Sequence, residues 1–187
     1  CTEVPKPTIC PACGTPLVET GANLFCPNKT CPPRVIANLT NFASKGGMNI
    51  DGFSEMTANV LFENFGVKDF ADLYTLDRAK VLELEGFKDA KTDNLLNAIE
   101  NSKSVSLSNF IFALGIDNVG KKTAKDLIKK FRTFDALMNA MEDELSLVDG
   151  VGDILAKNLV EFFDNADNRA MIANLFEAGV ILEDNEE

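Results

Sequence analysis

Histidine and tryptophan are absent from this chain of 187 residues, and a single tyrosine stands against 14 phenylalanines. Without histidine, the chain has no imidazole to serve as a general base, as a member of a catalytic triad or as a metal ligand. Long apolar runs are also missing, since no stretch approaches the ~20 residues of a membrane-spanning helix. No signal peptide is recognisable. We therefore expect neither imidazole-based catalysis nor a membrane partner.

The first residue is cysteine rather than methionine, which indicates a piece of a longer protein. The length, with 45% hydrophobic residues, allows one ordinary domain and a small module beside it. These two observations set the scale of the fold, but they do not identify a function.

Basic residues are few, and the net charge is −11. Such a charge argues against a protein that coats nucleic acid by bulk attraction. Yet six of the eight basic residues after position 105 lie between Lys121 and Arg132. This patch is either a solvated helix face or a contact for phosphates. The acidic end of the chain, Glu183 to Glu187, is expected to be solvated and disordered.

Four of the five cysteines form two close pairs, Cys10-x2-Cys13 and Cys26-x4-Cys31. Two such pairs across a short loop can place four thiolates at the corners of one tetrahedron, as a structural zinc ion requires. Two disulfides, or a reduced thiol cluster without metal, are the alternatives. Cys1 lies nine residues upstream of the first pair and is expected to be a free thiol.

A five-residue pattern occurs four times beyond the cysteines, with its third positions 34, 32 and 32 residues apart. Each copy reads apolar, acidic, Gly or Asn, apolar, and then a variable residue. Gly or Asn at the centre tolerates a positive φ, as a tight turn requires. The copies are Ile50-Asp51-Gly52-Phe53-Ser54, Leu84-Glu85-Gly86-Phe87-Lys88, Ile116-Asp117-Asn118-Val119-Gly120 and Val148-Asp149-Gly150-Val151-Gly152.

Helical periodicity surrounds each copy, and the helix that follows starts one residue later in the second copy than in the others. In the third, Ala124, Leu127, Ile128 and Phe131 share one face, while Lys122, Lys125 and Lys129 share another. The pattern predicts a mostly α-helical fold: a small four-cysteine zinc-finger module over 1–36 and four helix-hairpin-helix repeats. The repeats form two tandem pairs, over 37–105 and over 106–187 with the acidic tail.

The hairpins are candidate DNA-binding sites, because the first amides of a helix have no partner within the helix and its N-terminus carries a partial positive charge. Glycine turns between packed helices are the structural alternative. The pair Gly150 and Gly152 is the best candidate; the first two hairpins lack a second glycine, and Ser54 can cap its helix. The candidate residues are Gly52, Ser54, Gly86, Lys88, Asn118, Gly120, Lys121, Lys122, Gly150 and Gly152.

Several longer strings accompany these motifs: Cys10-Pro11-Ala12-Cys13-Gly14, Cys26-Pro27-Asn28 with Cys31-Pro32, Asn41-Phe42-Ala43-Ser44, Met48-Asn49-Ile50-Asp51-Gly52, Asp72-Leu73-Tyr74 and Phe112-Ala113-Leu114-Gly115-Ile116. With them, essentially the whole chain resembles the zinc-finger and helix-hairpin-helix region of bacterial NAD-dependent DNA ligase. The resemblance implies zinc on Cys10, Cys13, Cys26 and Cys31. It also implies a cytoplasmic, monomeric protein whose hairpins contact the phosphate backbone of nicked duplex DNA from the minor-groove side.

Enzymes of that family transfer AMP from NAD to one of their own lysines, then to the 5′-phosphate of a nick, and seal the strand in replication and repair. The adenylated lysine lies in a Lys-x-Asp-Gly string, and the nearest string here, Lys91-Thr92-Asp93-Asn94, lacks the glycine. We interpret it as a coincidence. The missing domains of the same chain are then partners, and NAD and magnesium belong to the parent enzyme alone. This fragment is expected not to ligate DNA.

Two other interpretations compete with the resemblance to a DNA ligase. The chain can be a DNA-binding module of another repair or recombination protein. It can also be a protein-interaction domain that uses its acidic helices and its zinc knuckle as a scaffold. A Lys-x-Asp-Gly string upstream of Cys1 would favour the ligase, whereas loss of DNA affinity even at low salt would favour the scaffold.

Overall fold

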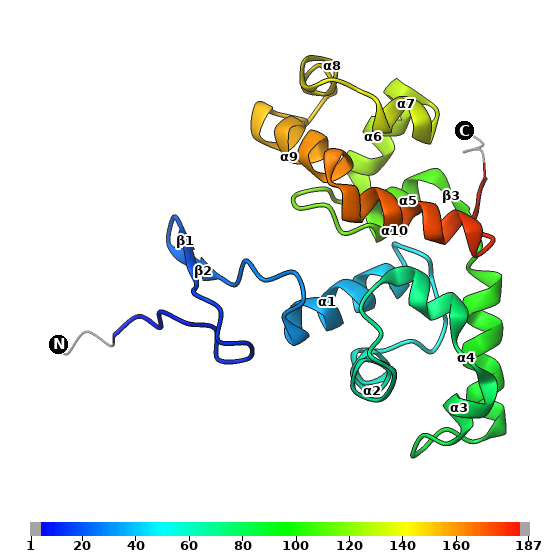
Figure 1. The fold of residues 1–187 in the computed structure, drawn as a ribbon. Coiled ribbons are helices and arrows are strands. Elements are labelled where there is room, and N and C mark those ends of the chain that lie inside the picture. The colour runs from blue at the N-terminus through cyan, green and yellow to red at the C-terminus, as the bar shows by residue number, and fades with distance from the viewer. Residues whose placement is uncertain (1–4, 184–187) are drawn as a thin grey trace.

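The computed structural model describes residues 5–183, so Cys1 and residues 184–187 lie outside it. Figure 1 shows a small N-terminal module standing beside a larger helical body. No helix in the described part is both long and apolar enough to cross a membrane. The predicted mostly helical fold is confirmed.

The N-terminal module is a knuckle followed by a β-hairpin. Strand β1 (Val18–Thr20) pairs with β2 (Asn23–Phe25) in antiparallel register. Gly21, at φ +63°, makes the turn between them. An isolated bridge between Ile9 and Pro16 closes the knuckle below the hairpin.

The first lobe of the body begins directly after the last cysteine. Helix α1 (Pro32–Ala43) starts with prolines, which suit the first helical positions because an N–H there would have no partner within the helix. The predicted boundary at residue 36 falls within this helix. The lobe contains α1 (Pro32–Ala43), α2 (Glu55–Phe65), the 3-10 helix η1 (Phe70–Thr75), α3 (Arg78–Leu82) and α4 (Asp89–Asn101).

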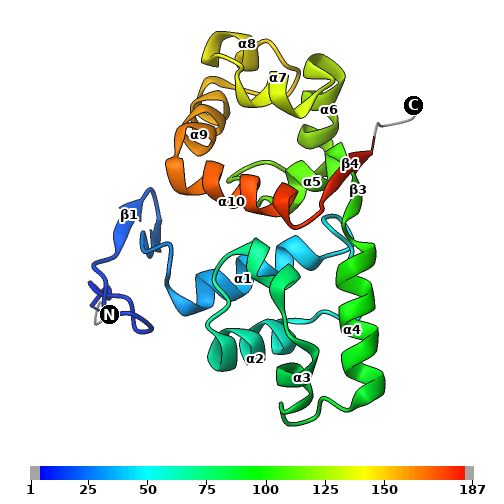
Figure 2. The same ribbon diagram turned by 45° about the vertical axis from the view of Figure 1, so that its right-hand side comes forward.

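The second lobe is closed by a short parallel ladder between β3 (Ser104–Ser106), which starts the lobe, and β4 (Ile181–Glu183), which ends it. Figure 2 shows the two lobes stacked, with α10 lying along the boundary between them. The lobe contains β3 (Ser104–Ser106), α5 (Leu107–Ala113), α6 (Lys121–Phe131), α7 (Phe134–Met138), α8 (Glu142–Ser146), α9 (Asp153–Asp164), α10 (Ala166–Glu177) and β4 (Ile181–Glu183).

One apolar core runs through both lobes. Phe42 of α1 is fully buried and stacks on Phe70 of η1 with ring centroids 4.4 Å apart. Phe110 of α5 is also fully buried, and it meets Phe134 edge to face at 5.3 Å. Because aromatic rings bury large areas and prefer such geometries, each pair stabilises the lobe in which it lies.

The sequence did not predict some of the smaller elements. Helices η1, α7 and α10 and the β3–β4 ladder carry no signal of the repeat. The expectation of a disordered acidic end is wrong at Glu183, which pairs with Ser106 in the ladder; the rest of that end lies outside the described residues. The helix after the second hairpin starts at Asp89, in step with the other three, so its expected delay is also wrong.

Candidate metal centre and nucleic-acid interface

The four cysteines of the module converge on one point. All four Sγ atoms lie within 4.8 Å of one another, with Cys10 and Cys31 3.7 Å apart and Cys13 and Cys26 3.5 Å apart. A disulfide would hold its sulfurs at roughly 2.0 Å, and all four are free thiols. The two-disulfide alternative is therefore wrong. Sulfurs bound to one zinc at roughly 2.3 Å would lie about 3.8 Å apart, which the observed spacing matches.

Local backbone geometry explains how the cysteines meet. The Gly14 amide donates to the Cys10 carbonyl at 2.8 Å, and the Cys10 amide donates to the Thr15 carbonyl at 2.8 Å. Gly14 has φ +72°, a conformation that favours glycine, so the chain reverses tightly after Cys13. Cys31 then closes the set at the start of α1.

The thiols differ in acidity. Burial, together with the neighbouring sulfurs, raises the pKa of Cys31 to about 12. A hydrogen bond between the Thr15 hydroxyl and Cys13 Sγ, 3.3 Å apart, lowers the pKa of Cys13 to about 6. Four thiolates at such close range repel one another unless a cation lies among them. The donor set therefore fits a closed structural cation site of the zinc type, with no ligand position left for a substrate.

The four predicted hairpins share one geometry. Each has a positive φ at its third position: 76° at Gly52, 83° at Gly86, 66° at Asn118 and 80° at Gly150. In each turn the amide of the fourth residue donates to the carbonyl of the first, at 3.0 to 3.2 Å. The helix that follows begins three residues after the positive-φ residue in every copy. The bonds run from Phe53 to Ile50, Phe87 to Leu84, Val119 to Ile116 and Val151 to Val148.

Apolar residues hold the turns against the body while the tips remain in solvent. Ile116, Val119, Val148 and Val151 are buried. A Cβ added at Gly152 would meet nothing within 4 Å, and the same holds at the other glycines of the tips. All ten candidate DNA-binding residues are exposed. A strand of nucleic acid can therefore reach the main chain of each turn.

The helix starts differ in how their first amides are used. Ser54 caps α2 as predicted, and its hydroxyl accepts from the Thr57 amide at 3.3 Å. No side chain caps α4, α6 or α9, so their first amides face solvent without a partner in the described part of the chain. The last three hairpins thus leave more free donors than the first.

Charge separates the third hairpin from the fourth. Helix α6 has no acidic residue in its first turn and begins with Lys121 and Lys122, whereas α9 begins with Asp153. The predicted faces of α6 are confirmed, because Ala124 and Leu127 are fully buried while Lys122 is exposed. The third hairpin thus combines free amides with cations, whereas the fourth, the best candidate from the sequence, combines two glycines and free amides with a carboxylate.

The string from Lys91 to Asn94 lies inside helix α4 and performs structural roles. The Lys91 ammonium lies 4.4 Å from the centre of the Phe87 ring. Thr92 is fully buried. Arg78 donates to Asp93 at 2.7 Å, and this hydrogen bond lowers the pKa of Asp93. These contacts give Lys91, Thr92 and Asp93 structural roles in the helix.

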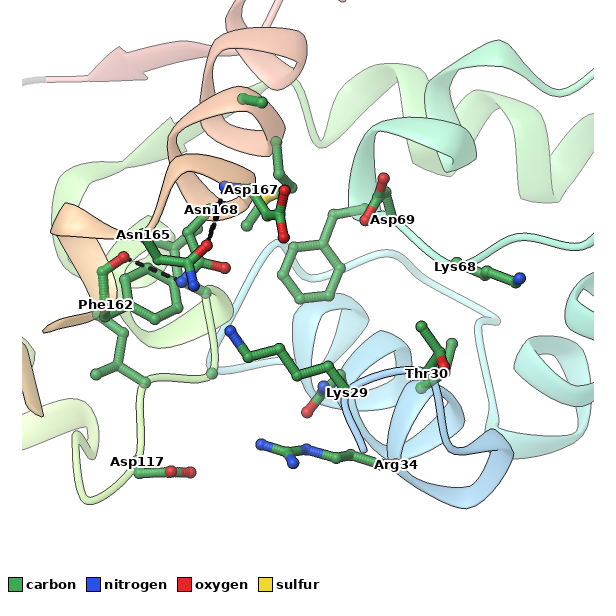
Figure 3. A pocket seen from close by; sticks show the side chains of 18 of the residues that line it. Lys29, Thr30, Arg34, Lys68, Asp69, Asp117, Phe162, Asn165, Asp167 and Asn168 are labelled. Atoms are coloured by element: carbon green, nitrogen blue, oxygen red, sulfur yellow. Dashed lines mark hydrogen bonds between the residues drawn. The ribbon is translucent and has the colours of Figure 1, made fainter. Parts of the chain in front are cut away.

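A cavity of about 680 Å³ lies where the cysteine module meets both lobes (Figure 3). Burial raises the pKa of Asp69, and the carboxylates of Asp72 and Asp167 add to the shift. Figure 3 shows Lys29 extending toward Asn165 and Asp167. Mixed charges make this cavity a poor phosphate site. Its charged lining residues are Lys29, Arg34, Lys68, Asp69, Asp117, Glu161 and Asp167.

Known proteins are similar to this chain in sequence. The family described as helix-hairpin-helix motif matches residues 109–172, which include the third and fourth hairpins. DNA ligase 2 of Clostridium acetobutylicum is 46% identical over 95% of this chain. The chain is homologous to a segment of bacterial DNA ligase. The DNA ligases of Clostridium tetani and of Clostridium botulinum strain Loch Maree are each 45% identical over the same share.

The chain spans 27% of the length of these DNA ligases. Because the match covers 95% of the chain, it extends over both lobes. Within this chain, the exposed hairpins are the places where the main chain is open to an anion.

Proposed function

We propose that this chain is the DNA-encircling part of an NAD-dependent DNA ligase that seals nicks in replication and repair. Its two lobes grip nicked duplex DNA through the phosphate backbone on the minor-groove side. Amides at the hairpins donate to phosphate oxygens, which carry no base identity, so binding does not depend on sequence. The residues in this role are Gly52, Ser54, Gly86, Lys88, Asn118, Gly120, Lys121, Lys122, Gly150 and Gly152.

The observation that carries this proposal is the open main chain at the hairpins. Gly120 and Gly152 cap their helices with no side chain over the amides, and an added Cβ at either would meet nothing within 4 Å. This arrangement lets an anion approach closely without help from bulk charge. It accounts for DNA binding by a chain whose net charge is −11.

A zinc ion on Cys10, Cys13, Cys26 and Cys31 has a structural role in this proposal. When bound, it supplies the cross-link that keeps the module folded. The Cys31 thiolate then fixes the start of α1, so the module is held at a defined place beside the first lobe. The chain works in a bacterial cytoplasm as a monomeric part of a larger enzyme, whose other domains bind NAD and magnesium.

Binding to nicked duplex DNA over a salt titration tests the proposal. We expect Gly152→Val to weaken binding more than Lys130→Ala, because a side chain at the tip blocks the approach to the amides. The reverse order would favour the lysine patch as the contact. No affinity at low salt would overturn DNA binding altogether. With NAD and nicked DNA, the chain should give no sealed product, and any ligation would overturn the fragment role.

A further inference from the structure

Two buried glycines form the turn that leads from α1 into the first hairpin. At Gly47, an added Cβ would lie 2.6 Å from the Phe42 carbonyl oxygen and 3.1 Å from Ala113 Cβ of α5. Gly47 therefore lets the turn pass between the end of α1 and the second lobe. The Asn41 side-chain amide donates to the Phe112 carbonyl at 3.2 Å, which ties the two lobes together at the same place.

Gly46, the neighbouring residue, lies under a side chain of the second lobe. A Cβ on Gly46 would overlap Lys121 Cε, and it would lie 3.0 Å from the Phe112 ring and 3.2 Å from Lys121 Nζ. Lys121 is the first residue of α6 and follows Gly120 of the third hairpin directly. The stem of this lysine thus lies across the turn that enters the first hairpin.

The position of the ammonium group adds a second reason for this contact. Helix α1 has no basic residue in its last turn. The C-terminal end of a helix carries a partial negative charge, which a nearby cation stabilises. Lys121 brings a cation from the second lobe to the turn that follows this end. The methylene stem of a long basic side chain can also pack along an apolar surface while its ammonium group stays in water.

We propose that Gly46 and Lys121 together position the third hairpin relative to the first, so that two hairpins from different lobes meet one duplex. This inference rests on the proposed function and assigns Lys121 a role beyond phosphate contact. Gly46 touches no DNA in this role. It acts through Lys121 because only a residue without a side chain leaves room for the lysine stem.

Once the first lobe has bound a duplex, binding of the second lobe to the same duplex is intramolecular. The alignment of the two lobes therefore matters. The gain in affinity then depends on geometry and disappears when both lobes cannot engage together. Lys122 provides a comparison, since it is exposed at the next position of α6 and belongs to the predicted solvent face. Removal of the Lys122 charge eliminates a phosphate contact but leaves the packing of Lys121 on Gly46 intact.

The experiment compares binding to a duplex long enough for both lobes with binding to one that reaches a single lobe. Gly46→Ala should lower affinity for the long duplex by roughly tenfold and leave the short duplex within about twofold. Thermal stability should change little, because Lys121 Cε lies near the end of a flexible side chain and the Phe112 ring, 3.0 Å away, needs only a small shift. Lys122→Ala, the matched control, should weaken binding of any duplex that contacts the second lobe, long or short, and lower its salt slope by about one.

A second pair of variants tests whether Gly46 acts through the lysine. In a Lys121→Ala background the lysine stem is gone, so Gly46→Ala should cause little further loss on the long duplex. Equal loss on both duplexes, no loss on either, or an undiminished effect in the Lys121→Ala background would overturn the inference. Failure of the wild-type chain to bind either duplex would instead overturn the proposed function, and the inference would fall with it.

Discussion

The cysteine module and the helical body keep their folds by different means. Within residues 5–31, only Cys10 and Cys31 are buried. The body buries a continuous set of apolar side chains, including Phe42, Phe110 and Phe163 with 2% exposure or less. A short segment with no apolar core needs a cross-link, and a metal ion supplies one. The body needs none, because removal of apolar surface from water stabilises it.

Metal removal should have the largest effect on stability, and it should affect the cysteine module but not the helical body. Strong chelation, or Cys31→Ser, should unfold the module over residues 5–31, since structural zinc contributes on the order of 10 kcal/mol to such modules. The body should stay folded. Amide NMR signals would report this, with module signals collapsing to unfolded positions while those of α5 and α6 persist.

Zinc content of freshly reduced protein is the control for that experiment. A stoichiometry of zero in wild-type protein, with a folded module, would contradict the metal role. Loss of the signals of both regions together would show that the comparison is wrong and that the body also depends on the ion.

A core deletion in the body should give the next largest effect. Phe110→Ala removes a fully buried ring that contacts Phe134 and Phe176, with centroids 5.3 Å and 5.7 Å away. We expect a loss of about 3–5 kcal/mol in the free energy of unfolding, measured with denaturant. Phe25→Ala is the matched control in the module, where the ring is 46% exposed and the expected change is about 0.5 kcal/mol or less. Similar losses for the two variants would undo the distinction.

A substitution at the fourth hairpin sharpens the comparison by separating stability from binding. Gly152→Ser introduces a residue preferred at helix starts, and the backbone there, at φ −84°, accepts a side chain without strain. The serine should stabilise the body by a few tenths of a kcal/mol. Its hydroxyl should also occupy an amide that a phosphate needs, which lowers DNA affinity several-fold. Stability and affinity changing in the same direction would argue against amide contacts.

The smallest expected effect concerns the ion pair across the second hairpin. Arg78 holds the pKa of Asp93 below its usual value. The pair therefore stabilises the native state above the unfolded-state pKa of about 3.9, and this contribution is lost as pH falls through the lower, native-state value. The difference in melting temperature between wild-type and Asp93→Asn should be small and positive near neutral pH and vanish in acid. A difference in melting temperature that grows in acid would contradict the expected pH dependence of this ion pair.

The features that the sequence predicted are those that depend on local chemistry. The spacing of Cys10, Cys13, Cys26 and Cys31 predicted one cluster because a knuckle and a hairpin have little geometric freedom. The turns at Gly52, Gly86, Asn118 and Gly150 were predictable because each needs a residue that tolerates positive φ. The face of α6 with Ala124 and Leu127 followed from helical period alone.

Other features depend on contacts between distant segments. The β3–β4 ladder pairs Val105 with Leu182, and neither segment alternates apolar and polar residues over enough positions to predict a strand. The placement of Lys121 on Gly46 joins residues of different lobes that lie far apart in the chain. Its sequence signal, a glycine pair after α1, is equally typical of an ordinary loop. Local sequence patterns do not predict contacts between residues that lie far apart in the chain.

The short parallel ladder between β3 and β4 has a consequence for protein engineering. Because Ser104 and Ile181 are neighbours, the second lobe enters and leaves at one place, with both its ends joined by hydrogen bonds. A unit whose ends adjoin can be transplanted as a cassette into a surface loop of a host protein with little strain. The two-hairpin lobe is thus suited to insertion as one unit into another protein.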